Sequence, residues 1–334
     1  MNKPRGIHYV SDQAFTWTRK VVRGKPIFVN RLGRPVSPKD QDRAKKLAIP
    51  PAWVEVKLSP DESGHIQAVG IDSRGRKQYI YHPDWVAYNQ KHKFESLQRF
   101  GEVLPELRET VQGHMRQHEL TRERVLATMV WLLEHTFIRV GNKEYAKENQ
   151  SYGLTTLRNK HVDVVGNNIT FSFKGKSNVY HELNIRNPRV ATTIKKCIEL
   201  PGYELFQYLD EDGNRRQIDS ADVNEYLKQI TGESLSAKDF RTWGGTILAG
   251  DTLYQLGAPE NGESLEKSLV TAVKEVSQHL GNTVSVCRQY YIHPKIIKSY
   301  QKAKLIPHFD TVYHSKVKIP EGLSLEEYAA LSLL

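Results

Sequence analysis

The sequence predicts an α+β protein in which a β-rich domain with an antiparallel sheet precedes a mainly α-helical domain that carries a small three-stranded sheet. Short apolar segments separated by turn residues fill residues 17–81, as is typical of a small β-domain. Beyond residue 93 the apolar residues recur with a helical period. Further strand-like segments interrupt the helices between residues 162 and 185. We therefore expect two domains, residues 1–93 and 94–334.

The strands of the first domain are bounded by residues that favour turns. The clearest signal is a hairpin whose turn, residues 72–75, reads Asp-Ser-Arg-Gly. A polar stretch over residues 84–94 follows the hairpin, and we expect the domain boundary within it. The expected strands lie at residues 26–29, 53–56, 66–71 and 77–81.

The second domain is expected to contain a long amphipathic helix. Apolar residues recur at helical spacing from Val125 to Val140, and Thr121 precedes them as the predicted N-cap. The three-stranded sheet is expected at residues 162–165, 169–173 and 179–185. Later helices are expected at residues 221–230, 237–256 and 265–280, with Ser220 as an N-cap, Gly281 as a C-terminal stop, and a last short helix at the Ser324–Glu327 capping box.

The charge distribution favours a polyanionic partner such as nucleic acid. The chain has a formal net charge of +10 and an isoelectric point of about 9.3. Residues 1–90 hold 16 Lys and Arg against 8 Asp and Glu, so they carry +8 of this charge. We therefore expect the N-terminal domain to grip the polyanion.

Other classes of protein are disfavoured by what the sequence lacks. Cys197 and Cys287 lie far apart without metal-ligand spacing, which argues against a disulfide framework or a zinc site. We find no leader and no apolar run near the roughly 20 residues that span a bilayer, so we expect an intracellular protein without membrane contact. P-loop, dinucleotide, His-Glu-x-x-His and Gly-x-Ser-x-Gly motifs are also missing, so we expect no nucleotide cofactor and no metal.

Five polar residues near structural breakpoints are the candidate catalytic residues. Each one alone is more simply explained as structure, because an arginine on an amphipathic helix is usually solvated, a lysine in a hairpin loop is usually exposed, and a tyrosine before Ile-His-Pro usually packs. Their combination suits phosphodiester transfer to a tyrosine. The candidates are Arg139, Lys176, Arg241, Asn282 and Tyr291.

Phosphodiester transfer to tyrosine needs these types of group. A phenol, with an ordinary pKa of about 10, must lose its proton as it attacks phosphorus, and nearby guanidinium groups favour that loss. Two forked arginine side chains and an asparagine amide match the negative charge that spreads over the non-bridging oxygens. A lysine surrounded by cations can protonate the departing oxygen, which is typically worth roughly 100- to 10,000-fold in rate.

The order and local sequence of these residues resemble the type IB DNA topoisomerases, specifically the small poxvirus-like branch that also occurs in bacteria. In this family the first catalytic arginine opens an Arg-(Phe/Val)-Gly segment followed by Lys-Glu-Asn, as at residues 139–141 and 147–149. The second arginine lies in Lys-Asp-(Leu/Phe)-Arg-Thr-(Tyr/Trp)-Gly, as at residues 238–244. The Leu-Lys/Arg-Asn-Lys-His segment of the family appears at residues 157–161. The resemblance extends from the hairpin at residues 75–81 to the last of the five candidates.

Two further motifs of the family assign the remaining roles. Its general-acid lysine follows a glycine in a hairpin loop, which selects Lys176 over Lys174. Its nucleophile lies nine residues after a Gly-His or Gly-Asn pair, which selects Tyr291 over Tyr290. The poxvirus members place a histidine where this chain has Asn282. We expect Asn282 to act by hydrogen bonding alone, because an amide cannot carry the proton.

The resemblance also implies contacts with duplex DNA outside the reaction centre. The second hairpin strand matches family positions that touch bases or phosphates, although its aromatic residues could instead pack against the sheet. Tyr145 matches a DNA-facing tyrosine, although helix packing could equally claim it. Phosphate contacts would fix the register and make binding salt-dependent. The predicted DNA-contacting residues are Arg76, Lys77, Gln78, Tyr79, Tyr81, Tyr145 and Lys238.

As a member of this family, the chain would relax supercoiled duplex DNA by transient cleavage of one strand, through a 3′-phosphotyrosyl intermediate, and religation. The resemblance implies a monomer that clamps the duplex and needs neither ATP nor a metal. If the source is bacterial, we expect a cytoplasmic, nucleoid-associated protein.

Two alternative functions remain open at this point. A tyrosine site-specific recombinase shares the Arg-Lys-Arg-Tyr chemistry and the catalytic fold. Recombinases usually have histidine three residues before the second arginine, where this chain has Lys238, and their N-terminal domain is commonly helical. A non-catalytic DNA-binding protein is the second alternative. The intact set of five candidates argues against that second alternative.

Overall fold

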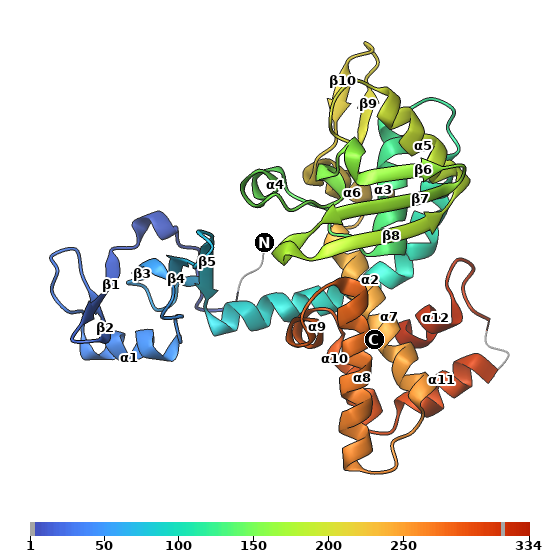
Figure 1. Ribbon diagram of the computed structural model, residues 1–334. Coiled ribbons are helices and arrows are strands. Elements are labelled where there is room, and N and C mark those ends of the chain that lie inside the picture. The colour runs from blue at the N-terminus through green and yellow to red at the C-terminus, as the bar shows by residue number, and fades with distance from the viewer. Residues whose placement is uncertain (1–3, 315–317) are drawn as a thin grey trace. The chain divides into compact units, whose positions relative to one another are not determined.

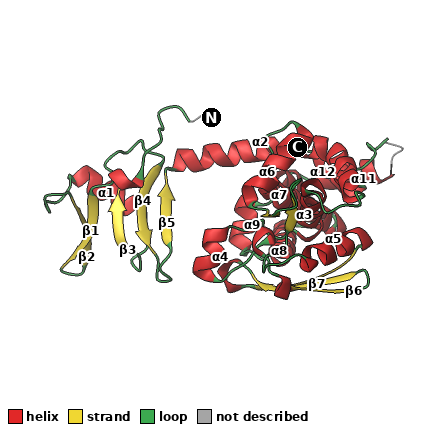
Figure 2. Cartoon of the chain, turned by 90° about the horizontal axis from the view of Figure 1, so that it is seen from above, coloured by secondary structure: helices red, strands yellow, loops and turns green. Residues whose placement is uncertain are grey.

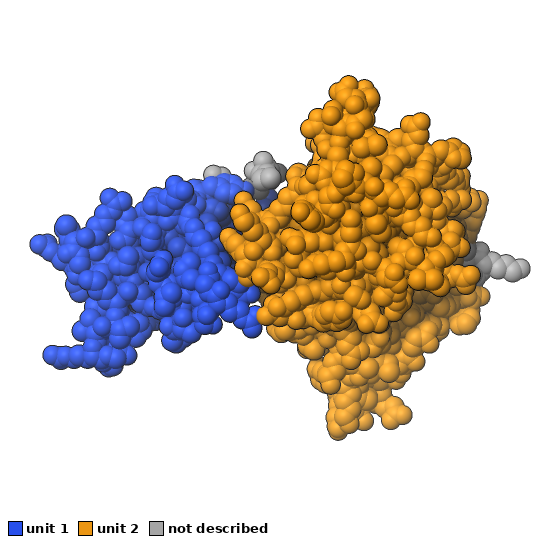
Figure 3. Space-filling model, turned by 45° about the horizontal axis from the view of Figure 1, so that its top comes forward, with its two compact units in different colours: residues 1–94 blue, residues 95–334 orange. Residues whose placement is uncertain are grey.

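A computed structural model describes residues 4–314 and 318–334 of the chain (Figure 1). The chain divides into two compact units, Met1–Phe94 and Glu95–Leu334, which Figure 3 colours separately. The first unit is built on a sheet and the second is mainly helical (Figure 2). The α+β class predicted from the sequence is therefore confirmed.

The sheet of the first unit has five strands, all antiparallel to their neighbours, in the order β2-β1-β3-β4-β5. The β4–β5 hairpin has the predicted bounds. Its turn closes through a 2.9 Å hydrogen bond from the Gly75 N–H to the Asp72 carbonyl. Gly75 has a φ of +73°, which a residue with a side chain rarely adopts. The strands are β1 (Trp17–Val22), β2 (Lys25–Val29), β3 (Val54–Leu58), β4 (Ile66–Ile71) and β5 (Lys77–Tyr81).

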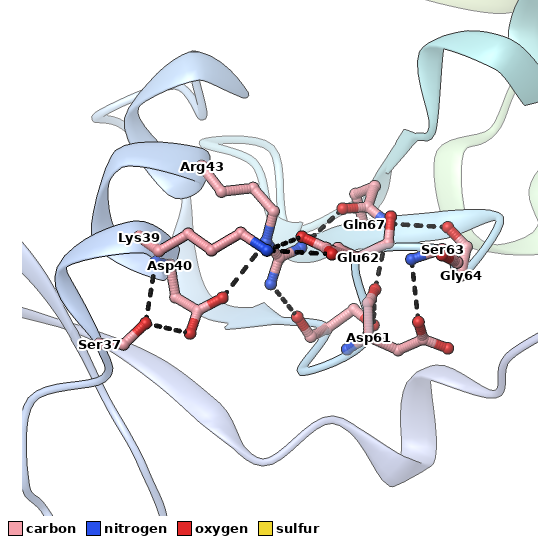
Figure 4. A network of polar contacts seen from close by, with 10 residues as sticks. Ser37, Lys39, Asp40, Arg43, Asp61, Glu62, Ser63, Gly64 and Gln67 are labelled. Atoms are coloured by element: carbon pink, nitrogen blue, oxygen red, sulfur yellow. Dashed lines mark hydrogen bonds and ion pairs between the residues drawn. The ribbon is translucent and has the colours of Figure 1, made fainter.

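Helix α1 (Pro38–Lys46) packs beside this sheet, and we did not predict it from the sequence. Its Arg43 donates one hydrogen bond to the side-chain oxygen of Gln67 on β4 (2.7 Å) and another to the carbonyl of Ser59, just after β3 (2.6 Å). Figure 4 shows these contacts together with the neighbouring Asp40. Gln67 and Ser59 are both buried, so the guanidinium satisfies polar groups that have left water. Arg43 thereby tethers the helix to two strands.

Helix α2 (Pro83–Met115) starts in the first unit and continues into the second. The polar residues 84–94, within which we expected the domain boundary, are therefore part of a helix. Pro83 occupies the first helical position, where its missing N–H costs nothing. Among the described residues 84–94, only Phe94 is buried. A helix segment without a continuous buried face has no apolar period, which is why the sequence did not reveal it.

The second unit combines a helical bundle with the predicted three-stranded sheet, which is antiparallel in the order β6-β7-β8 (Figure 1). Helix α5 packs on β6 and β7, and α3 contacts α5, α6 and α7. In the described part of the chain, no helix combines the length and apolar character needed to cross a bilayer. The strands are β6 (Val162–Val165), β7 (Asn168–Lys174), β8 (Tyr180–Arg186) and the hairpin β9 (Gln207–Leu209) with β10 (Arg215–Gln217). The helices are α3 (Arg122–Thr136), α4 (Lys143–Asn149), α5 (Pro188–Glu199), α6 (Ser220–Thr231), α7 (Ala237–Leu256), α8 (Gly262–Leu280), α9 (Val284–Tyr290), α10 (Pro294–Gln301), α11 (Leu305–His314) and α12 (Leu325–Leu331).

Helix α3 ends earlier than the sequence pattern predicts. Thr121 caps its start as expected, accepting a hydrogen bond from the Arg124 N–H (3.1 Å). The helix stops at Thr136 because Phe137 has a left-handed backbone (φ +51°, ψ +21°). A helix through Val140 is therefore wrong, and residues 138–140 form a loop.

The other predicted helix ends are close to the observed ones. Gly281 ends α8 in the left-handed conformation, with φ +57°. Ser324 and Glu327 form the predicted capping box of α12. The N-cap of α6 is Asp219, one residue before the predicted Ser220, because the Asp219 carboxylate accepts hydrogen bonds from the first free N–H groups of the helix.

Helix α7 connects the two apolar cores of the second unit. Its first half packs in the core around α3, and its second half packs in the core formed with α8 to α12. The C-terminal helix α12 binds α7 through Glu327, whose carboxylate accepts a hydrogen bond from the Trp243 indole (3.1 Å) and two from Arg108 (2.7 and 2.9 Å). Residues of the C-terminal segment thus hold the helix that carries Arg241.

Candidate active site

Arg241 lies on α7 at the point where two other helices end. It is 5% exposed. Its guanidinium donates hydrogen bonds to the carbonyls of Phe137, which caps α3, and of Leu280, the last residue of α8 (2.7 Å for the second). Helix C-termini carry partial negative charge, so both contacts suit a cation. Burial, together with the nearby Arg139 charge, lowers the pKa of Arg241 to about 10.

Arg139 lies in the loop that follows α3. Its guanidinium donates to the carbonyl of Gly281 (3.2 Å) and to the side-chain oxygen of Asn282. Burial lowers the pKa of Arg139 from its usual value, while the Tyr291 phenol beside it acts in the opposite direction. Because α3 ends early, Arg139 lies in a loop beside the end of α8.

Asn282 follows the left-handed Gly281, and its amide faces Arg139. A guanidinium only donates hydrogen bonds, so the Asn282 oxygen must point to Arg139. The amide nitrogen is closed off from solvent and has no hydrogen-bond partner among the described residues. Asn282 thus supports Arg139 through its oxygen, while the amide nitrogen donates to none of the described residues.

Tyr291 follows the short helix α9 and packs under Arg241. The Arg241 guanidinium carbon lies 5.2 Å from the centre of the Tyr291 ring. The carbonyl of Tyr291 rests on α7, where the Thr246 hydroxyl donates to it (3.4 Å) and Gly245 lies against it. A Cβ atom at Gly245 would lie 2.7 Å from this oxygen. The close approach of α7 therefore fixes the backbone of Tyr291.

Lys176 lies in the turn between β7 and β8, and its side chain is exposed. The next two residues, Ser177 and Asn178, have φ values of +65° and +64°. Two successive left-handed residues make a tight turn, so the chain reverses direction within a few residues. Lys174, the alternative lysine, lies at the end of β7.

These residues meet in one open pocket of about 530 Å³ in the second unit. Four of the five catalytic candidates line it, and the fifth, Asn282, lies behind Arg139. Tyr290 and Lys174 are not among its lining residues. Two predicted DNA-contacting residues, Tyr145 and Lys238, also line it. The lining residues with charged or phenolic groups are Arg139, Lys176, Lys238, Arg241, Glu144, Glu148, Tyr145, Tyr152 and Tyr291.

The other predicted DNA-contacting residues lie on β5 and its turn, in the first unit. Lys77, Tyr79 and Tyr81 share the exposed face of the strand, and the two tyrosine rings stack with centres 6.1 Å apart. Their exposure, 38% and 41%, argues against the reading in which they pack against the sheet. Arg76 and Gln78 instead bind the carboxylate of Asp72.

Sequence reasoning missed three residues that shape the pocket. Phe137 sets the end of α3, and its ring presses on Gly244, where a Cβ atom would lie 2.1 Å away. The carbonyl oxygen of Tyr291 lies against Gly245. His181 lies between the Lys176 turn and the end of α8. The adjacent glycines of α7 were a usable signal, because glycine is disfavoured inside helices unless another group approaches closely.

Comparison with known proteins decides the family. Residues 82–308 match the family described as eukaryotic DNA topoisomerase I, catalytic core, and residues 27–72 match bacterial DNA topoisomerase IB, N-terminal domain. A DNA topoisomerase 1B of Acanthamoeba polyphaga mimivirus is 34% identical over 273 residues, covering 80% of this chain and 81% of that protein. This chain belongs to the type IB DNA topoisomerases. The vaccinia virus (strain Copenhagen) DNA topoisomerase 1B is 25% identical over 262 residues, covering 77% of this chain and 78% of that protein.

The topoisomerase is therefore an isomerase, and the matched catalytic core contains all five candidate residues. The matched N-terminal domain ends at residue 72, before β5, so DNA contact by that strand stays a prediction. A solved structure of the XerH site-specific recombinase bound to difH substrate aligns with a TM-score of 0.37 at 15% identity, covering 60% of this chain and 52% of that one. This likeness is too low to bear on function.

Proposed function

We propose that this topoisomerase relaxes supercoiled duplex DNA by cutting and rejoining one strand, with Tyr291 as the covalent nucleophile. The observation that carries the proposal is the convergence of the Tyr291 phenol, two arginines and Lys176 on one pocket. Three cations beside one phenol suit a phosphodiester, which is itself an anion and gains negative charge on its oxygens in the transition state.

The proposed reaction exchanges one phosphodiester for another. The Tyr291 oxygen attacks phosphorus as its proton passes to solvent water, and the positive charge of Arg139 and Arg241 stabilises the phenolate that develops. The bond from phosphorus to the 5′ oxygen breaks, and Lys176 gives that oxygen its proton. A 3′-phosphotyrosyl bond then holds the cut strand while the free end rotates. The 5′ hydroxyl reverses the same steps.

The energy of the broken bond is retained in the phosphotyrosine, so the cycle is balanced without ATP and requires no redox partner. Arginine and asparagine groups supply the charge stabilisation for which other phosphoryl-transfer enzymes use metal ions. Asn282 holds Arg139 and keeps its amide N–H for a non-bridging oxygen, a role without proton transfer. We accordingly propose catalysis without a metal ion.

Contacts outside the reaction centre would hold the duplex. Lys238 and Tyr145 line the pocket, and in the proposed complex they meet the flanking backbone. Lys77, Tyr79 and Tyr81 share an exposed strand face of the first unit, which would meet the duplex elsewhere. We propose that the protein acts as a monomer and, in a bacterial cell, on the chromosome in the cytoplasm.

Relaxation of supercoiled plasmid in EDTA, without ATP, tests this function. The wild-type protein should give a ladder of relaxed topoisomers, and Tyr291→Phe should bind the duplex without relaxing it. Relaxation by Tyr291→Phe would exclude the assigned nucleophile. Binding without relaxation by the wild type would favour the non-catalytic alternative, and products joined only between paired sites would favour the recombinase.

A further inference from the structure

His181, on β8, lies between the two loops that carry Lys176 and Asn282. On one side is Gly175, where a Cβ atom would lie 2.6 Å from the imidazole. On the other side is Gly281, where a Cβ atom would lie 2.9 Å from it. Each glycine directly precedes a candidate catalytic residue. The imidazole therefore separates and supports both loops at once.

The ring itself is held in place from the sheet. It stacks on Phe173 of β7, with ring centres 5.2 Å apart and planes 20° apart. Phe173 is buried in the apolar core of the second unit. The imidazole is half-buried and makes no hydrogen bond to another described residue. Shape and stacking, rather than polar contacts, fix its position.

The Lys176 turn has little other support. Its described residues 175–179 form hydrogen bonds only within the turn, from Gly175 to the Val179 carbonyl (2.7 Å) and from Val179 to the Lys176 carbonyl (3.5 Å). All residues from Lys176 to Tyr180 are exposed. The end of α8, in contrast, is bound by Arg139 and Arg241. Loss of the His181 ring would therefore affect the lysine turn more than the asparagine.

The charge around His181 favours a neutral ring. Arg139, Arg241 and Lys176 line the small cavity beside it, and His279 faces the same cavity from α8. Burial and the two arginines lower the pKa of His181 from its usual value. A neutral aromatic group can fill this space without adding to the positive charge of the pocket.

We propose that His181 is a positioning residue, whose flat ring holds the Gly175–Lys176 turn so that the Lys176 ammonium reaches the departing 5′ oxygen. This inference rests on the proposed function, because it assigns His181 to the general-acid half of that reaction. It predicts that a defect at His181 appears only when the leaving group needs a proton.

A duplex whose scissile 5′ bridging oxygen is replaced by sulfur provides the test. A thiol has a pKa of about 8.5, so a thiolate leaves without protonation, whereas a 5′ alkoxide does not. In single-turnover cleavage, His181→Ala should be about 10- to 100-fold slower than wild type on the oxygen substrate, since misplacing a catalytic group by about 1 Å costs roughly 100-fold. On the sulfur substrate it should cleave within about threefold of wild type. Lys176→Ala should behave in the same way, and Asn282→Ala should be slow on both substrates.

Two more variants keep the test informative if His181→Ala is poorly folded. In Gly175→Ala, the added methyl group would push the turn away from the His181 ring. Its cleavage should again be slow on the oxygen substrate and close to the wild-type rate on the sulfur substrate. Gly175 has a φ of −93°, which alanine adopts without strain. His181→Phe retains a flat neutral ring and should cleave the oxygen substrate within about threefold of wild type. The matched control is His279→Ala, which removes a histidine from the same cavity without touching the turn.

The possible outcomes separate this inference from the proposed function. Equal slowing of His181→Ala on both substrates, or full activity on the oxygen substrate, would overturn the positioning role. A His181→Phe variant as slow as His181→Ala would also overturn it, because the effect would then come from the imidazole nitrogens. Failure of the wild type to form any covalent complex with either substrate would instead refute the proposed function.

Discussion

Substituting Gly245 by alanine should slow DNA cleavage without weakening DNA binding. Gly245 lies inside α7, with the carbonyl oxygen of Tyr291 against it. An added Cβ atom would lie 2.7 Å from this oxygen, and 3.3 Å from side-chain atoms of Leu280 and Val276. The side chains can move, but the oxygen belongs to the backbone of the nucleophile. The alanine methyl group must therefore push Tyr291 away from α7.

The size of the displacement sets the size of the effect. Carbon–oxygen contacts in proteins are rarely closer than about 3.3 Å, so the Tyr291 carbonyl must move by roughly 0.6 Å. A misplacement of about 1 Å can cost about 100-fold in rate, so we expect a roughly 10-fold slower cleavage step. Alanine favours a helix over glycine by about 1 kcal/mol, which offsets part of the strain and should leave the protein folded.

Single-turnover formation of the covalent complex on a short duplex measures this step, and a binding titration with the same duplex measures affinity. Gly113→Ala is the matched control, because Gly113 lies in helix α2 with no atom within 4 Å of an added Cβ. It should gain a little stability and cleave at the wild-type rate. A wild-type cleavage rate for Gly245→Ala would refute the claim that contact with α7 positions the nucleophile.

Three further predictions concern stability and binding. Glu327→Gln should lower the free energy of unfolding by roughly 3 kcal/mol in urea titrations, because it removes a buried charged partner of Arg108 and Trp243. An unchanged urea midpoint would show that the contacts of α12 do not stabilise α7. Burial and two neighbouring cations lower the pKa of His161 to about 4, so the unfolded chain takes up this proton first as the pH falls below 6.5. The stability that His161 contributes is complete above pH 6.5 and is lost towards pH 4. His161→Gln should therefore reduce the drop in unfolding free energy between pH 7 and 4.5 by about 2 kcal/mol. The same drop in the wild type and the variant would contradict a neutral His161 in the folded protein. Lys238→Ala should reduce the slope of log affinity against log salt by about 1 for duplex binding, whereas an unchanged slope would remove Lys238 from the phosphate contacts.

The sequence was sufficient where local signals and the fold agree. The β4–β5 hairpin was predicted to the residue, because the turn that begins at Asp72 ends in a glycine with the required positive φ. The bounds of α7 were also predicted correctly, since a capping box at Ser236 precedes its apolar period and Gly257 ends it. In both segments the local preference already specifies the observed structure.

The sequence failed where distant contacts decide the local conformation. The apolar period of α3 continues to Val140, but the helix ends at Thr136, and the left-handed Phe137 that caps it packs its ring against Gly244 on another helix. His181 looks like one of several alternating residues on β8, and only the folded chain brings it against Gly281. Family motifs identified the five candidate catalytic residues, whereas the residues that position them required the structure.

Mapping the residue that becomes covalently joined to DNA tests the proposed mechanism most directly. The protein would be trapped on a duplex nicked so that the short strand released with the 5′ hydroxyl diffuses away, digested with a protease, and analysed by mass spectrometry. We predict a single nucleotide adduct on Tyr291, bonded through the 3′ phosphate, and no adduct in Tyr291→Phe. An adduct on Tyr290, or none on the wild-type protein, would contradict the proposed mechanism.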